Sequence, residues 1–237
     1  MNFGGDKHSQ EVRVVSILAL LSLALTSSNL QAQWNWQNPV PQGNTLNAVQ
    51  FLTPVLGCAA GNYGTILRTT DGGAHWEEQE YGRTDDLRAI LFVDSLRGWA
   101  VGDNGTILHT SNGGEDWLEQ MSETFEGFNG VAFIDGSRGW VVGDNGLIER
   151  TMNGGGIWEK LTNVPVGGGT NLNGAFFFNE NSGFVVGSHG TILRTIDGGR
   201  TWSRPPAPTQ EHLLAVTFID VNNGWVVGAG GVLLRTI

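Results

Sequence analysis

Short runs of alternating apolar and polar residues recur along the chain, and turns rich in glycine, aspartate and asparagine separate them. Residues 46–51 read Leu-Asn-Ala-Val-Gln-Phe, and residues 98–102 read Gly-Trp-Ala-Val-Gly. Runs of aliphatic and aromatic residues between tight turns are typical of β-strands. No segment after residue 32 has the 3.6-residue period of an amphipathic helix. The pattern therefore predicts an all-β domain.

A turn pattern, Thr-x-(Asp/Asn)-Gly-Gly-x-x-Trp, occurs four times at spacings of 41, 41 and 44 residues. Its tryptophans are Trp76, Trp117, Trp158 and Trp202. A second pattern, Gly-(Trp/Phe)-x-Val-Gly, recurs at the same period, with a degenerate first copy at Gly57. Four short strands in a repeat of about 40–45 residues are the signature of a propeller blade. Five such units account for residues 33–237.

Each unit is predicted to hold four strands, A to D. Strand A is expected at residues 46–51, 87–92, 128–133, 172–177 and 213–218. Strand B carries the Gly-Trp pattern, strand C carries the Thr-Ile-Leu-Arg-Thr run, and strand D begins near the tryptophan. The predicted fold is a β-propeller with five four-stranded blades. These blades either close into a ring or form part of a larger propeller of roughly six to eight blades.

The repeat is permuted at its ends. Residues 34–39 begin Trp-Asn-Trp where a strand D belongs, and the chain stops at Ile237 where a strand C ends. We expect residues 34–39 to form the outer strand of the last blade, because an unpaired sheet edge invites aggregation. The alternative is a chain cut short after Ile237, whose blades form an open arc. Cysteines at Gln37 and Leu234, in a Cys58→Ser background, would crosslink only in the closed ring.

The Asp-Gly-Gly turn and its tryptophan resemble the Asp-box, or bacterial neuraminidase repeat. The longer unit, residues 98–117 for example, is similar to the repeat of the photosystem II stability/assembly factor family of β-propellers. This resemblance covers residues 34–237 and implies a protein-binding or assembly module rather than an enzyme. It also implies that arginine-rich patches contact the partner. Better-known members of that family have seven blades, and the resemblance implies no link to photosynthesis.

The first 32 residues have the pattern of a signal peptide. An apolar run at residues 14–25 follows a short polar segment with Lys7 and Arg13, and residues 26–32 are small and polar. A membrane-spanning helix needs about 20 apolar residues, so this run is better suited to a signal-peptide core. We expect cleavage after Ala32, a secreted or periplasmic protein, and no membrane span after cleavage. An uncleaved membrane anchor is the alternative.

Charge and cysteine content each exclude a class of site. Lys and Arg total 13 against 23 Asp and Glu, a net charge of -10. Nucleic-acid binding needs clustered Lys and Arg, so no nucleic-acid partner is expected. The single cysteine, Cys58, permits neither an intramolecular disulfide nor a cysteine-based zinc site. The five histidines lack the spacing of metal ligands, so no metal or other cofactor is expected.

Two sets of repeated polar residues are candidates for binding a partner. The first set occupies the second position of strand A, where the strand meets the central channel: Asn47, Arg88, Asn129 and Asn173. The second set occupies the basic position of strand C: Arg68, Arg150, Arg194 and Arg235. A ring of arginines can bind anions or carboxylates. The alternatives are hydrogen bonds to loop backbone for the first set and local pairing with acidic residues of the next blade for the second.

A third repeated set is interpreted as structural. It consists of the Asp-box residues Asp71, Asn112, Asn153 and Asp197, together with the four tryptophans that close the turns. A short Asx side chain accepts hydrogen bonds from the backbone that follows it, and the adjacent glycines supply positive φ angles. Asparagine at two positions keeps the acceptor and loses the charge, which suits a turn and does not suit carboxylate chemistry.

These observations favour an exported, non-enzymatic propeller that binds or scaffolds another protein. Short, nearly identical blades leave few loop residues for catalysis. A sialidase-like glycoside hydrolase is one alternative, because Asp-boxes occur in such enzymes. That chemistry needs an arginine cluster beside a tyrosine nucleophile, and the chain has two tyrosines, Tyr63 and Tyr81. A fragment of a larger secreted repeat protein is the other alternative.

Overall fold

A computed structural model describes residues 43–236, which lie in one of the two units of the chain, Gln37–Ile237. The predicted signal peptide and the predicted strand at residues 34–39 lie outside the described residues. Residues 43–236 form five antiparallel sheets, and their only helical elements are single 3-10 turns. The prediction of an all-β propeller architecture is confirmed.

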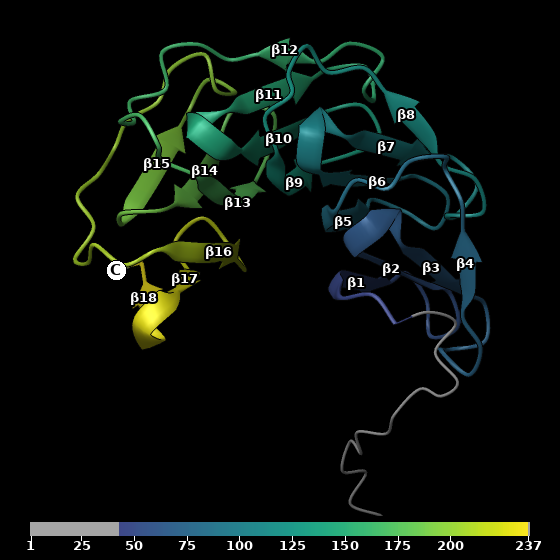
Figure 1. Ribbon diagram of the computed structural model, residues 1–237. Helices are drawn as coiled ribbons and strands as arrows, with labels where there is room; N and C mark the ends of the chain where they lie inside the picture. The colour runs from purple at the N-terminus through teal and green to yellow at the C-terminus, as the bar shows by residue number, and fades with distance from the viewer. Residues whose placement is uncertain (1–42, 237) are drawn as a thin grey trace, which may run out of the picture. The chain divides into compact units, whose positions relative to one another are not determined.

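Each sheet is one blade (Figure 1). Blade 1 holds β1 (Leu46–Phe51), β2 (Gly57–Gly61), β3 (Ile66–Thr69) and β4 (Glu77–Gln79). Blade 2 holds β5 (Leu87–Phe92), β6 (Gly98–Gly102), β7 (Ile107–Thr110) and β8 (Leu118–Gln120). Blade 3 holds β9 (Phe128–Phe133), β10 (Gly139–Gly143), β11 (Ile148–Thr151) and β12 (Glu159–Lys160). Blade 4 holds β13 (Leu172–Phe177), β14 (Gly183–Gly187) and β15 (Thr191–Thr195). Blade 5 holds β16 (Leu213–Phe218), β17 (Gly224–Gly228) and β18 (Leu233–Arg235).

The tight turn between the second and third strands explains the repeated glycines. In blade 2, Asn104 has a φ of 54° and Gly105 a φ of 71°. A Cβ atom on Gly105 would lie 2.1 Å from the carbonyl oxygen of Thr124. Glycine is therefore required there both by the left-handed backbone and by the close approach of another segment.

Blades 1, 2 and 3 have the four predicted strands, whereas the described residues of blades 4 and 5 form three strands each. The strand predicted to complete blade 5, residues 34–39, lies outside the described residues. In blade 4 the segment after the Asp-box makes only an isolated bridge, between Arg194 and Ser203. Pro205, Pro206 and Pro208 follow, and proline has no backbone N–H to donate to a neighbouring strand. In blade 5 the described chain reaches residue 236 at the end of the third strand, β18.

Neighbouring blades pack face to face, and an apolar cluster lies in each of the four spaces between them, here called wedges. Trp99 stacks on Phe133 in the wedge between blades 2 and 3, with ring centroids 3.6 Å apart. Trp140 stacks on Phe177 at the same distance between blades 3 and 4. Each stack joins the second strand of one blade to the first strand of the next.

The wedge between blades 1 and 2 lacks this stack, because Cys58 stands at the tryptophan position. Cys58 is fully buried, and burial raises the pKa of its thiol to about 11. The side-chain amide of Gln50 adds two hydrogen bonds to the backbone of Phe92, at 2.8 and 3.2 Å. This wedge therefore combines a small buried side chain with an added polar link.

The five blades follow one another in an arc (Figure 1). The innermost strands pack in chain order, β1 on β5, β5 on β9, β9 on β13 and β13 on β16. β1 and β16 make no comparable contact with each other, so residues 43–236 do not show a closed ring. No helix among these residues is long and apolar enough to cross a membrane.

The two ends of the arc present apolar sheet faces to solvent. We call the face of blade 1 that points away from blade 2 the leading face. It carries Val49 and Phe51. Their equivalents in blade 2, Ile90 and Phe92, pack against blade 1. We call the face of blade 5 that points away from blade 4 the trailing face. It carries three residues equivalent to those that blade 2 buries against blade 3: Trp225, Val227 and Leu233.

Candidate functional site

The first predicted set lies along the inner edge of the blades, beside the irregularities in the pairing of strand A with strand B. A β-bulge re-aims the side chain it carries, and here the amides reach the next blade. The Nδ2 atoms of Asn47, Asn129 and Asn173 each donate to the carbonyl oxygen of the first residue of the next innermost strand, at 2.8, 3.0 and 2.7 Å. The amides therefore link blades, and their contact with a partner stays a prediction.

Arg88 belongs to the same set and is the centre of a polar network. Its guanidinium contacts the carboxylate of Asp103 and the Oδ1 atom of Asn129, and lies 3.5 Å from Asp144 Oδ2. Asn129 Nδ2 also donates to Asp144 Oδ1 at 2.9 Å. Burial raises the pKa of the Asp103 carboxyl, while Arg88 opposes that shift. The network links blades 2 and 3 through one guanidinium that lies between two carboxylates.

The structure does not bring the four arginines of the second set together, because each belongs to a different blade. Arg68 Nε donates to the carbonyl oxygen of Gly113 in the next blade at 2.9 Å. Arg150 Nη1 donates to the equivalent oxygen of Gly198 at 3.1 Å. The guanidinium of Arg194 lies 6.0 Å from the ring of Phe184, and that of Arg235 lies 5.7 Å from the ring of Trp225. A single anion-binding ring is therefore absent from residues 43–236, and partner contact by the individual arginines stays a prediction.

The Asp-box side chains stabilise their own turns. Asp71 Oδ1 accepts hydrogen bonds from Thr69 Oγ1 and from the backbone N–H of His75, both at 2.9 Å. These bonds, chiefly the backbone bond from His75, lower the pKa of Asp71 to about 2. Asn112, Asn153 and Asp197 accept the same backbone bond, at 3.0, 2.9 and 2.9 Å. A neutral asparagine makes the same bond as aspartate, so the turn needs the acceptor and not the charge.

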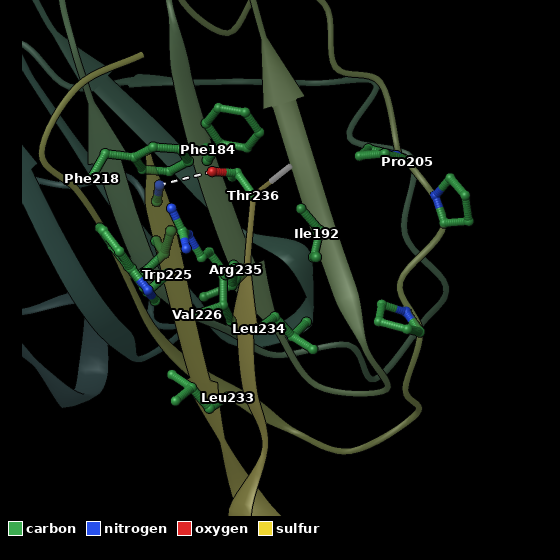
Figure 2. Close-up of a pocket in the computed structure, with 15 residues that line it drawn as sticks. Phe184, Ile192, Pro205, Phe218, Trp225, Val226, Leu233, Leu234, Arg235 and Thr236 are labelled. Carbon is green, nitrogen blue, oxygen red and sulfur yellow. Dashed lines mark hydrogen bonds between the residues drawn. The ribbon is translucent and has the colours of Figure 1, made fainter. Parts of the chain in front are cut away.

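An apolar pocket of about 620 Å³ lies in the wedge between blades 4 and 5 (Figure 2). Its walls include Phe184 and Ile192 from blade 4, Phe218 and Leu234 from blade 5, and Pro205 from the segment that follows blade 4. A second pocket of similar volume adjoins it and shares Phe184, Pro205 and Phe218. Pockets of this size, lined by apolar side chains, are typical of ligand sites.

The repeat explains why this wedge is hollow. In the wedge between blades 3 and 4, Trp202 packs with Trp140, Leu161, Phe177 and Leu193. The residues at these four surrounding positions in the next wedge are Phe184, Pro205, Phe218 and Leu234, and all of them line the pocket. The described part of blade 5 has no Asp-box turn and no tryptophan at the position of Trp202. The pocket is therefore the space that a tryptophan-bearing fourth strand occupies in the other blades.

The edge of β18 borders this pocket and has no neighbouring outer strand among residues 43–236. In blade 4 the residue equivalent to Arg235 is Arg194, whose backbone N–H and C=O exchange hydrogen bonds with Ser203 at 2.9 and 2.8 Å. Arg235 therefore directs its own N–H and C=O outward from β18. The site combines an apolar pocket with an edge strand that can extend its sheet.

Sequence reasoning missed the pocket, although two signals were visible. Pro205, Pro206 and Pro208 interrupt the fourth strand of blade 4, and residues 213–237 contain no fifth Asp-box tryptophan. Of the predicted site residues, Arg235 alone lines this pocket, while Arg194 lines the adjoining one.

The repeated sheets, Asp-box turns and wedge tryptophans define a β-propeller protein of the Asp-box class. A family model covers the chain in overlapping matches at residues 26–127, 84–165, 119–206 and 162–237. The chain belongs to that family, which is described as photosynthesis system II assembly factor YCF48. The family resemblance inferred from the sequence is confirmed.

Solved structures include similar propellers of two kinds. The structure described as "YCF48 bound to D1 peptide" is 17% identical, covers 84% of this chain and 95% of that one, and has a TM-score of 0.48. YCF48 from Cyanidioschyzon merolae is 17% identical over 84% and 97% of the two chains, with a TM-score of 0.46. The GH74 enzyme of Niastella koreensis is 14% identical over 78% of this chain and 35% of that one, with a TM-score of 0.63. The likeness to that enzyme shows the fold alone. The comparison with curated proteins found no match.

Proposed function

We propose that this chain is an exported, non-enzymatic propeller that binds an extended segment of another protein, as an assembly or scaffold module. The observation that carries the proposal is the apolar pocket beside the outward edge of β18. Backbone hydrogen bonds along an edge strand supply affinity for an extended peptide, and a pocket for its side chains supplies specificity. Membership of a family described as an assembly factor supports the same function.

A glycoside hydrolase is the second candidate, supported by the fold that the chain shares with GH74 enzymes. Such an enzyme needs an acid with a raised pKa that reaches the substrate, and a second carboxylate at a defined distance from it. Among residues 43–236, the carboxyls whose pKa is raised are Asp103 and Glu149. Asp103 is held by Arg88, and Glu149 is buried within blade 3. These contacts favour the binding function.

A display library of extended peptides, selected against the full exported chain, tests the proposal. We expect enrichment of segments with aromatic or aliphatic side chains. Arg235→Pro removes the outward N–H of β18 and should weaken their binding by about tenfold or more. Arg235→Ala also loses the arginine side chain but keeps that N–H, so it is the matched control and should bind clearly more tightly than Arg235→Pro. Enriched peptides that bind Arg235→Pro as well as Arg235→Ala would contradict the edge-strand function.

Two further measurements address export and catalysis. Intact mass should show an exported product that begins after Ala32; a product that begins at Met1 or Asn2 would overturn the export proposal. Chromogenic sialosides and β-glucosides should not be hydrolysed. Turnover that disappears on Asp86→Asn or Glu126→Gln would favour the hydrolase.

A further inference from the structure

Blade 3 differs from blade 2 in the segment that leads from its last strand to the first strand of the next blade, here called the connector. The chain spans 11 positions from Trp117 to Phe128, but 14 positions from Trp158 to Leu172. The added positions lie in the connector that follows β12. This connector therefore breaks the repeat in the middle of the described chain.

The shorter connector of blade 2 closes on the turn between β6 and β7. Ser122 Oγ donates a hydrogen bond to the carbonyl oxygen of Gly105 at 2.8 Å, and a Cβ atom on Gly105 would collide with the backbone of Thr124. The equivalent glycine of blade 3 is Gly146, where a Cβ atom would meet only the side chain of Val166. The backbone of the longer connector thus stands away from the turn, and a cavity of about 350 Å³ lies between them.

The cavity has an aliphatic wall and two charged groups of opposite sign. The charged groups are Glu126, from the preceding connector, and Lys160, from β12. The aliphatic side chains that line it are Leu147, Leu161, Val164 and Val166. Ligand pockets have volumes of about 300–1,000 Å³, so this cavity suits a small molecule.

The same two charged positions are satisfied internally at the boundary between blades 1 and 2. The equivalent of Glu126 there is Asp85, and the equivalent of Lys160 is Glu119. Arg83 Nε donates to Asp85 Oδ2 at 2.6 Å, and Arg83 Nη1 contacts the carboxylate of Glu119. One guanidinium therefore binds both carboxylates at that boundary.

Glu126 has no such partner, because Thr124 stands at the position of Arg83. Its carboxylate accepts a hydrogen bond from Asn145 Nδ2 at 2.9 Å and forms no ion pair with any residue between 43 and 236. A neutral amide leaves the charge of the carboxylate uncompensated.

Lys160 also lacks an ion pair within the described chain. It lies opposite Glu149 in the pairing of β11 with β12, yet both carboxyl oxygens of Glu149 lack a hydrogen-bond partner. Burial raises the pKa of Glu149 to about 7, so below that pH this carboxyl is mostly neutral. The ammonium group of Lys160 is therefore available to a molecule in the cavity.

We propose that this cavity binds a small zwitterion with an aliphatic body, the chemical class of the aliphatic α-amino acids. The ammonium group of the ligand donates to Glu126, and its carboxylate accepts from Lys160. The aliphatic part packs against Val164 and Val166. Charge-assisted hydrogen bonds of this kind are stronger than neutral ones. The site is separate from the β18 edge and adds a small-molecule ligand to the proposed peptide-binding function.

Isothermal titration calorimetry of the full exported chain tests the inference with L-leucine at pH 6. We expect saturable binding with a Kd of about 1 mM or lower. Three fragments each lack one feature of leucine: 3-methylbutylamine lacks the carboxylate, 4-methylpentanoate lacks the ammonium group, and glycine lacks the side chain. Each should bind about tenfold more weakly or worse. The inference is overturned if leucine gives no saturable signal up to about 10 mM, or if any fragment binds as tightly as leucine.

Single variants assign the two charged groups. Glu126→Gln and Lys160→Met should each weaken leucine binding by about tenfold. Thr124→Arg supplies the guanidinium found at the boundary between blades 1 and 2, which should pair with Glu126 and abolish binding. Glu115→Gln makes the same charge change at an exposed position in the Asp-box turn of blade 2, and it should bind leucine like the unaltered chain. Thermal unfolding checks that each variant is folded, and folded Glu126, Lys160 and Thr124 variants that bind normally would overturn the assignment.

Discussion

The inner wedges and the two ends of the arc use the same sequence pattern with opposite results. Trp99 and Trp140 are fully buried in stacks, whereas Trp225, from the same Gly-Trp-x-Val-Gly pattern, is only half-buried. Each blade therefore has two apolar faces, one for the preceding blade and one for the next. Each face is buried only where a neighbouring blade packs against it. The comparison teaches that the outer faces of blades 1 and 5 carry the residues of a blade boundary without a neighbouring blade among residues 43–236.

Trp140, which is stacked, and Trp225, which is not, give the largest expected contrast. Trp140→Ala should reduce the free energy of unfolding by about 3–5 kcal/mol, because it leaves a cavity beside Phe177. Trp225→Ala should cost about 1 kcal/mol in a dilute sample, because less apolar area is lost from the core. Urea unfolding at low protein concentration measures both values. Equal losses would mean that the trailing face is already covered within one chain.

Glu149 tests the inner region through pH. It is almost fully buried, and burial raises the pKa of its carboxyl to about 7 from 4.5, with Lys160 opposing the shift and Glu123 adding to it. Between these pH values the folded chain holds a proton that the unfolded chain releases. The free energy of unfolding should therefore decrease by about 3 kcal/mol as pH rises through this window.

Glu149→Leu isolates this contribution, since leucine stands at the equivalent position in other blades: Leu67, Leu108, Leu193 and Leu234. The variant should gain stability over the unaltered chain above pH 7, and the difference between them should shrink toward pH 4.5. A difference that does not change with pH would show that Glu149 is charged in the folded chain. Urea unfolding at a series of pH values provides the measurement.

The Asp-box turns give a smaller effect. Asp197→Ala removes the acceptor of the Thr201 backbone N–H and should cost about 1–3 kcal/mol. Asp197→Asn keeps the acceptor, as Asn112 and Asn153 do, and should cost less than half as much. Thermal unfolding compares the two variants. Equal destabilisation would assign the stabilising role to the charge instead.

The strand-C arginines give the smallest contrast. Arg150→Ala removes the hydrogen bond to Gly198 in a complete wedge and should cost about 1–2 kcal/mol. Arg194→Ala, beside the hollow wedge, loses a ring contact and should cost about 0.5 kcal/mol. The same unfolding assay distinguishes them, and a larger loss at Arg194 would contradict the description of the hollow wedge.

The sequence was sufficient for the features that each blade contains within itself. Strand A has the predicted bounds in all five blades, and the Asp-box turns depend on residues only four apart, such as Asp71 and His75. The features between blades were harder to predict. Asn47 reaches the backbone of the next blade through a bulge, and no sequence pattern specifies which carbonyl it meets. The four arginines share a sequence position, yet each faces its own boundary.

Hydrogen exchange of β18, compared with β11, tests the central claim that the ends are open halves of a blade boundary. In a dilute sample, the peptide containing Arg235 should exchange much faster than the peptide containing Arg150, whose strand is covered by β12. A bound extended peptide should slow the exchange of β18, while that of β11 stays unchanged. Protection of β18 that equals that of β11 in the chain without peptide would contradict the account, because the edge would then be covered within a single chain.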